Sequence, residues 1–74
     1  MSQASQQNLA HLERIDAHIS RSEQAVTKQQ ARVDGLESAG NDSSLSRSVL
    51  KNFKTCLELQ YSHRASARRE LRLA

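Results

Sequence analysis

The hydrophobic positions in the first half of the chain repeat with the period of an amphipathic helix. Leu, Ile or Val recurs every seven residues, and two further apolar residues extend the row, which consists of Leu12, Ile15, Ile19, Val26, Val33 and Leu36. This heptad spacing places the row along one side of an α-helix. Ser22 and Gln29 stand at core positions that the row leaves polar. The pattern predicts a helix over about residues 5–38.

A second row follows, with the spacings of three and four that are typical of a helix. Its members are Leu45, Val49, Leu50, Phe53, Cys56, Leu57, Gln60, Ala67 and Leu71. The chain has no proline, few aromatic residues and no run of β-branched residues. These choices favour helix over strand. The second helix is predicted over about residues 43–72.

The segment between the two rows is predicted to be a tight turn. Gly40 is suited to the left-handed conformation that ends a helix. Asp42 is suited to cap the next helix, because its carboxylate can accept hydrogen bonds from the amides of Ser44 or Leu45. A connection this short makes the helices antiparallel neighbours. The predicted fold class is therefore all-α, an antiparallel two-helix hairpin that resembles a coiled coil.

Folding back at Asn41 predicts the register, in which facing residues have numbers that add up to about 82. In this register the apolar rows face each other, and Ser22 faces Gln60. A polar layer inside such a seam sets register and oligomeric state; the alternative is that it marks a weak hairpin with exposed edges. We expect the following residues at the helix–helix interface: Leu12, Ile15, Ile19, Val26, Val33, Leu36, Val49, Leu50, Phe53, Cys56, Leu57 and Leu71.

The apolar content is small for a chain that folds alone. Leu, Ile, Val and Phe account for 15 of the 74 residues, and a chain of this length is marginal unless a disulfide, a metal or a partner supports it. Cys56 is the single cysteine, so an internal disulfide is excluded. We therefore expect the hairpin to form a homodimer, with two chains making a four-helix bundle.

The chain carries no signal for a membrane. No apolar run approaches the length of a membrane span, and the Ser/Gln-rich residues 1–8 have neither the basic nor the apolar region of a secretory signal. We expect residues 1–8 to be a flexible N-terminal segment. We also expect a cytoplasmic protein without a membrane partner, in which Cys56 stays reduced.

Positive charge is concentrated near the C-terminus. Residues 1–40 carry four basic and five acidic groups, whereas residues 41–74 carry seven basic and three acidic groups. Four arginines lie within three turns of helix, namely Arg64, Arg68, Arg69 and Arg72. Like charges at this spacing repel, so an anionic partner is expected. Nucleic acid or an acidic membrane surface would serve, and so would Glu13 and Asp16, which the register places opposite residues 66–69.

Candidate residues for chemistry are few. His18 and His63 are brought side by side by the register, with Cys56 one or two turns away, and such a set suits a transition metal. Its ordinary interpretation is a pair of surface histidines, or a contact that responds to pH. Cys56 on the apolar row is typical of a small buried side chain. Since no nucleophile, base or phosphate-binding loop is recognisable, we expect no enzymatic activity, no metal and no cofactor.

Several short motifs resemble a group of small uncharacterised proteobacterial proteins of alphaproteobacterial type. They are His18-Ile19-x-Arg21-x-Glu23-Gln24, Gln29-x-x-Arg32-Val33-x-x-Leu36-Glu37-x-x-Gly40-x-Asp42, Leu50-x-x-Phe53 and His63-Arg64. The resemblance spans about residues 11–71, and the Gly40-x-Asp42 turn and Phe53 are its most specific marks. The chain departs from the group at Asn41 and in its serine-rich start to the second helix. The resemblance implies a helical hairpin in a bacterial cytosol and carries no activity with it.

The expected function follows from these features. A small core with two helical seams favours a non-catalytic interaction or scaffold protein that acts through helix–helix contacts. The alternative is a basic accessory protein that binds nucleic acid through Arg64, Arg68, Arg69 and Arg72.

Overall fold

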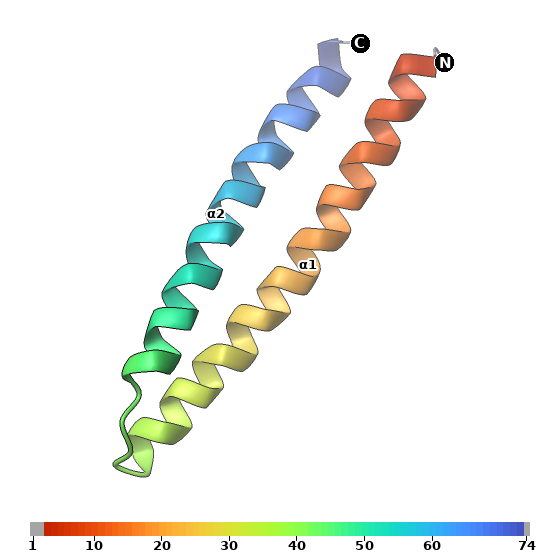
Figure 1. The fold of residues 1–74 in the computed structure, drawn as a ribbon. Helices are drawn as coiled ribbons and strands as arrows, with labels where there is room; N and C mark the ends of the chain where they lie inside the picture. Colours follow the sequence, from red (N-terminus) through yellow and green to blue (C-terminus); the bar gives the residue numbers. More distant parts are fainter. Residues whose placement is uncertain (1–2, 74) are drawn as a thin grey trace.

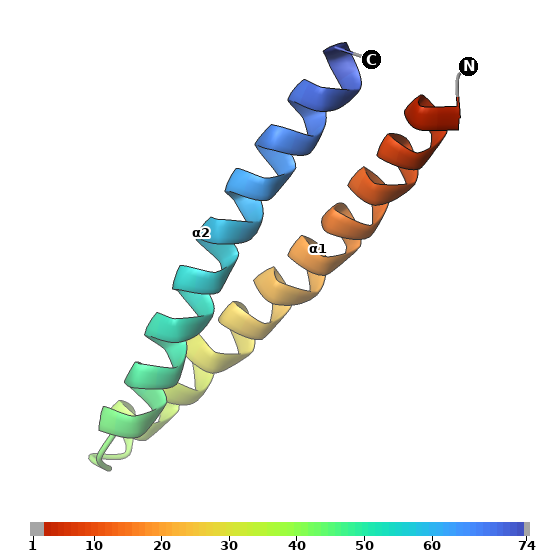
Figure 2. The same cartoon turned by 45° about the horizontal axis from the view of Figure 1, so that its top comes forward.

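The chain is an antiparallel hairpin of two long helices, as predicted (Figure 1). The computed structural model describes residues 3–73, and the side chains of residues 6–72. Helix α1 spans Gln3–Ser38 and helix α2 spans Ser44–Leu73. The helices lie side by side in both views, with their free ends at the same end of the molecule (Figure 2). The hairpin is a rod of 57 × 14 × 13 Å.

The helix ends lie close to the predicted ones, with one difference at the N-terminal side. Helix α1 begins at Gln3 rather than near residue 5. Residues 3–8, which we expected to form a flexible segment, are therefore part of the helix. Met1 and Ser2, the rest of that segment, lie outside the described residues. Helix α2 begins at Ser44, one residue after the predicted start.

Helix α1 ends in the glycine motif that the sequence predicts. Gly40 has a φ of 73°, a left-handed conformation that a residue with a Cβ adopts only with strain. The amide of Asn41 donates to the carbonyl of Leu36 at 2.8 Å, and the amide of Gly40 donates to the carbonyl of Glu37 at 3.0 Å. This pair of bonds is the Schellman arrangement, which satisfies carbonyls that the helix end leaves free.

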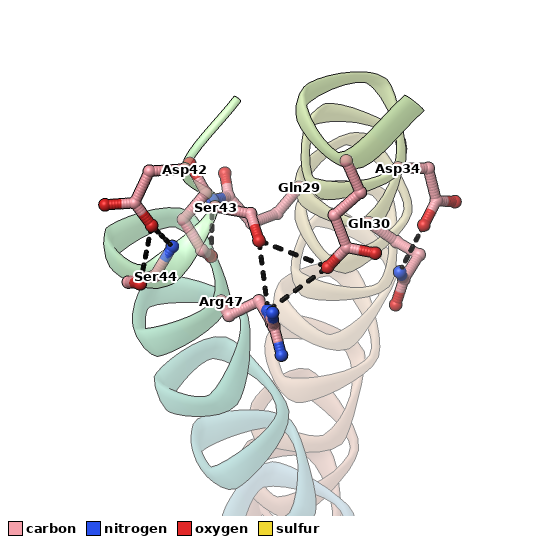
Figure 3. Close-up of polar contacts among 9 residues, drawn as sticks. Gln29, Gln30, Asp34, Asp42, Ser43, Ser44 and Arg47 are labelled. Atoms are coloured by element: carbon pink, nitrogen blue, oxygen red, sulfur yellow. Dashed lines mark hydrogen bonds and ion pairs between the residues drawn. The ribbon is translucent and has the colours of Figure 1, made fainter. Parts of the chain in front are cut away.

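Helix α2 begins with two polar residues that share the capping (Figure 3). Asp42 Oδ1 accepts hydrogen bonds from the Ser44 amide at 2.9 Å and the Ser44 hydroxyl at 2.6 Å. These two bonds lower the pKa of Asp42 from its ordinary value of 3.8, with a smaller contribution from Arg47. The predicted bond to Ser44 is thus confirmed. The Ser43 carbonyl, however, accepts the first helical bond, from the Arg47 amide at 2.8 Å, so Ser43 occupies the N-cap position.

The core is a single row of contacts between the helices. Its most buried apolar side chains are Ile19, Val33, Leu50 and Ala67. Residues that are buried or half-buried mark a regular heptad seam on each helix. On α1 the seam consists of Leu12, Ile15, Ile19, Ser22, Val26, Gln29, Val33 and Leu36; on α2 it consists of Ser46, Leu50, Leu57, Gln60, Arg64, Ala67 and Leu71, with the more exposed Phe53 between Leu50 and Leu57.

Two residues that we expected on the α2 seam lie outside it. Leu45 is 79% exposed, and Cys56 is exposed as well. Each precedes a seam position by one residue, and one residue corresponds to about 100° around a helix. Leu45 and Cys56 therefore point away from α1, and the prediction that Cys56 packs against α1 was wrong. Phe53 is on the seam but remains 38% exposed.

Four polar contacts across the hairpin, three between the helices and one from Ser43 in the turn, agree with the predicted register. The pairs are Asp16 with Arg64, Glu23 with Tyr61, and Glu37 with both Ser43 and Arg47. The residue numbers in each pair add up to 80 or 84, close to the predicted value of about 82. The seam residue Gln29 differs, because its amide donates at 2.9 Å to the backbone carbonyl of Ser46, which points along α2 toward the following turn.

Candidate functional site

Helix α2 has an exposed side that carries no charge, which we call the uncharged face. It consists of the exposed residues Leu45, Ser48, Asn52, Thr55, Cys56, Leu59, Ser62, His63 and Ser66, with the half-buried Val49 at its border with the seam. At about 100° per residue these positions share one side of the helix. Arg69 and Glu70 follow Ser62 and His63 by seven residues on this side, and they end the face. Its length is about 30 Å, at 1.5 Å per residue.

The charged residues of α2 lie elsewhere on the helix. Arg64 is on the seam. At about 100° per residue, six others lie outside the uncharged face and toward its opposite side, namely Arg47, Lys51, Lys54, Glu58, Arg68 and Arg72. In a chain in which 26% of residues are charged, a charge-free row of ten residues is a marked departure. Depletion of charge is the compositional mark of the centre of a protein interface.

The uncharged face presents apolar side chains to the outside. Leu45 and Leu59 are 79% and 57% exposed, and Cys56 between them is exposed too. The Thr55 hydroxyl donates to the Lys51 carbonyl of its own helix at 3.0 Å, so that its polar atom is already used. Single exposed leucines are ordinary on protein surfaces, so the absence of charge around these side chains, rather than their exposure alone, distinguishes this face.

The other flank of the hairpin is held by polar contacts. Tyr61 follows Leu59 by two residues and therefore lies on nearly the opposite side of the helix. Its hydroxyl donates to Glu23 Oε2 at 2.7 Å. This bond to the carboxylate raises the pKa of Tyr61 above its ordinary value of 10.0. Arg64 pairs with Asp16 at 3.7 Å and lies 5.2 Å from the centre of the Tyr61 ring. Near the turn, Arg47 pairs with Glu37 at 3.1 Å.

The three histidines line one groove, together with two arginines. The groove has a volume of about 530 Å³ and contains His11, His18, His63, Arg14 and Arg21 in its lining. The register therefore does bring His63 near His18. Arg21 Nη2 donates to His18 Nδ1 at 2.9 Å. Among the described residues, no group of three or more His, Cys, Asp or Glu is arranged to hold a metal ion.

The four C-terminal arginines fall into two sets. Arg64 is paired with Asp16, as the internal interpretation of the charges anticipated, so it is engaged within the hairpin. Neither ion pair of the described side chains uses Arg68, Arg69 or Arg72. Those three residues line a shallow groove of about 480 Å³ at the open end of the hairpin, together with Ala65 and Leu71.

The sequence prediction missed two features of this surface. Leu59 was assigned to neither apolar row, although it lies with Leu45 and Cys56 on a separate side of the helix. The absence of charge along that side was readable from the sequence and is the signal that could have found it. The bond between Glu23 and Tyr61 was missed as well, although the predicted register places these two residues near each other.

No protein-family model, curated protein or solved structure matches the chain. The resemblance to small proteobacterial proteins therefore stays a prediction. No helix in the described part of the chain is long and apolar enough to cross a membrane.

Proposed function

We propose that the protein is a non-catalytic interaction module that docks another helix along the uncharged face of α2. The observation that carries the proposal is the exposure of Leu45, Cys56 and Leu59 on one charge-free side of the helix. Amphipathic helices recognise each other by apolar side chains at spacings of three, four and seven residues. Leu45, Val49, Asn52, Cys56 and Leu59 have these spacings.

The rest of the hairpin acts as the rigid support in this proposal. The Schellman turn and the contacts of Arg47, Tyr61 and Arg64 hold α2 on α1 from the seam and from the opposite flank. The uncharged face is then free for a partner. Since an exposed thiol such as Cys56 persists in a reducing compartment, the proposal places the protein in the cytoplasm.

Site-specific photo-crosslinking in cells tests the proposal. Benzoylphenylalanine is introduced into the full chain at Leu45 or Leu59, and in matched controls at Lys54 or Glu58 on the charged side of the same helix. We expect covalent adducts from Leu45 and Leu59 and none from the controls. Equal adducts from all four positions, or none from any, would show that the uncharged face is not a docking surface.

A second candidate function is the binding of nucleic acid by Arg68, Arg69 and Arg72. The observation that favours it is that these arginines are close together while the described ion pairs leave them unused. The phosphates of a nucleic acid would neutralise the mutual repulsion of the three arginines. Binding would then weaken as the salt concentration rises. Arg64 contributes less than the sequence suggested, because it pairs with Asp16.

A gel shift with duplex DNA and with RNA tests this second candidate. Replacement of Arg68, Arg69 and Arg72 with alanine should abolish a shift that the wild type shows at low salt. The matched control replaces Arg47, Lys51 and Lys54, which removes the same charge from the other end of α2 and should preserve most of the shift. Absence of any wild-type shift at low salt rules the candidate out.

A further inference from the structure

The uncharged face of α2 has an approximate two-fold pattern about Asn52. Leu45 and Leu59 stand seven residues before and seven residues after Asn52, and Val49 and Cys56 stand three before and four after it. Two such helices that run antiparallel and meet at Asn52 place Leu45 of one copy against Leu59 of the other. The same arrangement places Val49 against Cys56 and Asn52 against Asn52.

Resting on the proposed function, we infer that the helix docked on this face is a second copy of this chain. The two α2 helices pack antiparallel, with the two-fold axis at Asn52. Leu45 and Leu59, which the hairpin leaves 79% and 57% exposed, then cover each other.

Asn52 explains why this register is preferred over a shifted one. A carboxamide carries both a donor and an acceptor, so two asparagines on a two-fold axis can exchange hydrogen bonds. A polar residue at one position of an apolar seam specifies the register, because a shift leaves it facing an apolar group. With Asn52 at the centre, every apolar side chain of the face meets another apolar side chain.

The distribution of charge supports the antiparallel direction. The chain has a formal net charge of +3, so that two copies repel each other unless their positive regions stay apart. A parallel pair of α2 helices would bring the two sets of Arg68, Arg69 and Arg72 side by side. The antiparallel pair places these sets at opposite ends of the dimer and keeps Lys54 and Glu58 on its outside.

Disulfide trapping tests the position of the axis. In the variant Asn52→Cys/Cys56→Ser, the two introduced thiols lie at the axis, and mild oxidation should convert most of the protein to a covalent dimer. In the wild type, the two Cys56 residues lie about 12 Å apart along the helix direction, beyond the Cα separation of about 7 Å that a disulfide spans. We expect little cross-linking of the wild type, and little of Lys54→Cys/Cys56→Ser, which carries its thiol on the charged side.

Charge exchange tests the direction of the helices. Leu45→Glu and Leu59→Lys should each raise the dimer dissociation constant by roughly tenfold or more in sedimentation equilibrium. The double variant Leu45→Glu/Leu59→Lys should restore association, because the antiparallel register puts the new acid of one copy beside the new base of the other. All three change exposed side chains, and circular dichroism checks that the hairpin still folds.

Each negative result has its own meaning. Equal cross-linking at positions 52 and 54, or failure of the double variant to recover, overturns the antiparallel register at Asn52. A wild type that stays monomeric at several hundred micromolar overturns the second copy as the partner. The proposed docking function then still stands if photo-adducts form at Leu45 and Leu59 with a different protein, and it fails separately if no adduct forms there.

Discussion

The Tyr61 hydroxyl of α2 donates a 2.7 Å hydrogen bond to the Glu23 carboxylate of α1, across 38 residues of sequence. Arg64, one turn after Tyr61 on α2, lies over the tyrosine ring and pairs with Asp16 of α1. These contacts join the two helices on the flank that faces away from the uncharged face. Because one of them depends on a neutral tyrosine, its contribution to stability can be tested by varying the pH.

We expect the contribution of Tyr61 to disappear at alkaline pH. Its folded-state pKa is raised above the ordinary value of 10.0 by the bond to Glu23, because the carboxylate accepts from the neutral phenol. A raised pKa means that the contribution to the free energy of unfolding is complete below pH 10 and is lost as pH rises through the folded value. Tyr61→Phe should therefore be less stable than the wild type at pH 7, and the difference should shrink above pH 10. Urea unfolding followed by circular dichroism at several pH values measures it, and a difference that does not change with pH contradicts the account.

The two glycines should respond to alanine in opposite directions. Gly35 lies inside α1 with no atom within 4 Å of an added Cβ, so Gly35→Ala should raise the free energy of unfolding by about 0.5–1 kcal/mol through the better helix propensity of alanine. Gly40 has a φ of 73°, so Gly40→Ala should lower it by about 1–2 kcal/mol. Urea titrations of both variants provide the comparison. A rise in the free energy of unfolding for Gly40→Ala would mean that the turn is not held in the left-handed conformation.

Shortening a side chain to alanine should destabilise the hairpin on the seam and not on the uncharged face. Ile19 is 2% exposed, and Ile19→Ala should cost about 2–5 kcal/mol because it leaves a cavity between the helices. Leu45 is 79% exposed, and Leu45→Ala should change stability by less than about 0.5 kcal/mol. Both are measured by thermal and urea unfolding at low micromolar concentration, where self-association contributes least. A large loss of stability for Leu45→Ala under these conditions would mean that Leu45 packs against α1.

Gln60 should be replaceable with a gain in stability. Its Oε1 atom is buried in the seam without a hydrogen-bond partner among the described residues, and an unsatisfied buried acceptor costs about 1–3 kcal/mol. Gln60→Met keeps the length of the side chain and removes the polar atom, so we expect the free energy of unfolding to rise by about 1 kcal/mol. Ser22→Ala, on the facing helix, is the control and should be nearly neutral. A loss of stability in Gln60→Met would show that the oxygen is satisfied in solution.

Local signals account for the parts of the fold that were predicted well. Gly40 and Asp42 lie in the turn and act on amides and carbonyls only a few residues away, so their roles follow from the sequence near them. The hairpin and its register follow from the short connection and from the heptad spacing of α1. The start of α1 at Gln3 was predicted less well, because neither the apolar row nor a strong capping residue marks it.

The candidate site was predicted only in part, because α2 offers two apolar sides. Leu50 and Leu57 lie on one side, Leu45 and Leu59 lie on the other, and Val49 and Cys56 lie near the boundary. Spacings of three and four describe both sides equally well, so the prediction merged them into one row. The same ambiguity placed Cys56 in the interface, although it is exposed.

The number of helices, the turn between them and their antiparallel direction all follow from the sequence alone. Helical hydrogen bonds and caps form within a few residues, and a short turn leaves one direction for the second helix. Which side of α2 packs on α1 becomes known only once the two helices are in place, and with it the pairing of Arg64 with Asp16 and the outward position of Leu45 and Leu59. Burial against a distant helix depends on positions in space, because the apolar spacing of α2 fits either side equally well until α1 is in place.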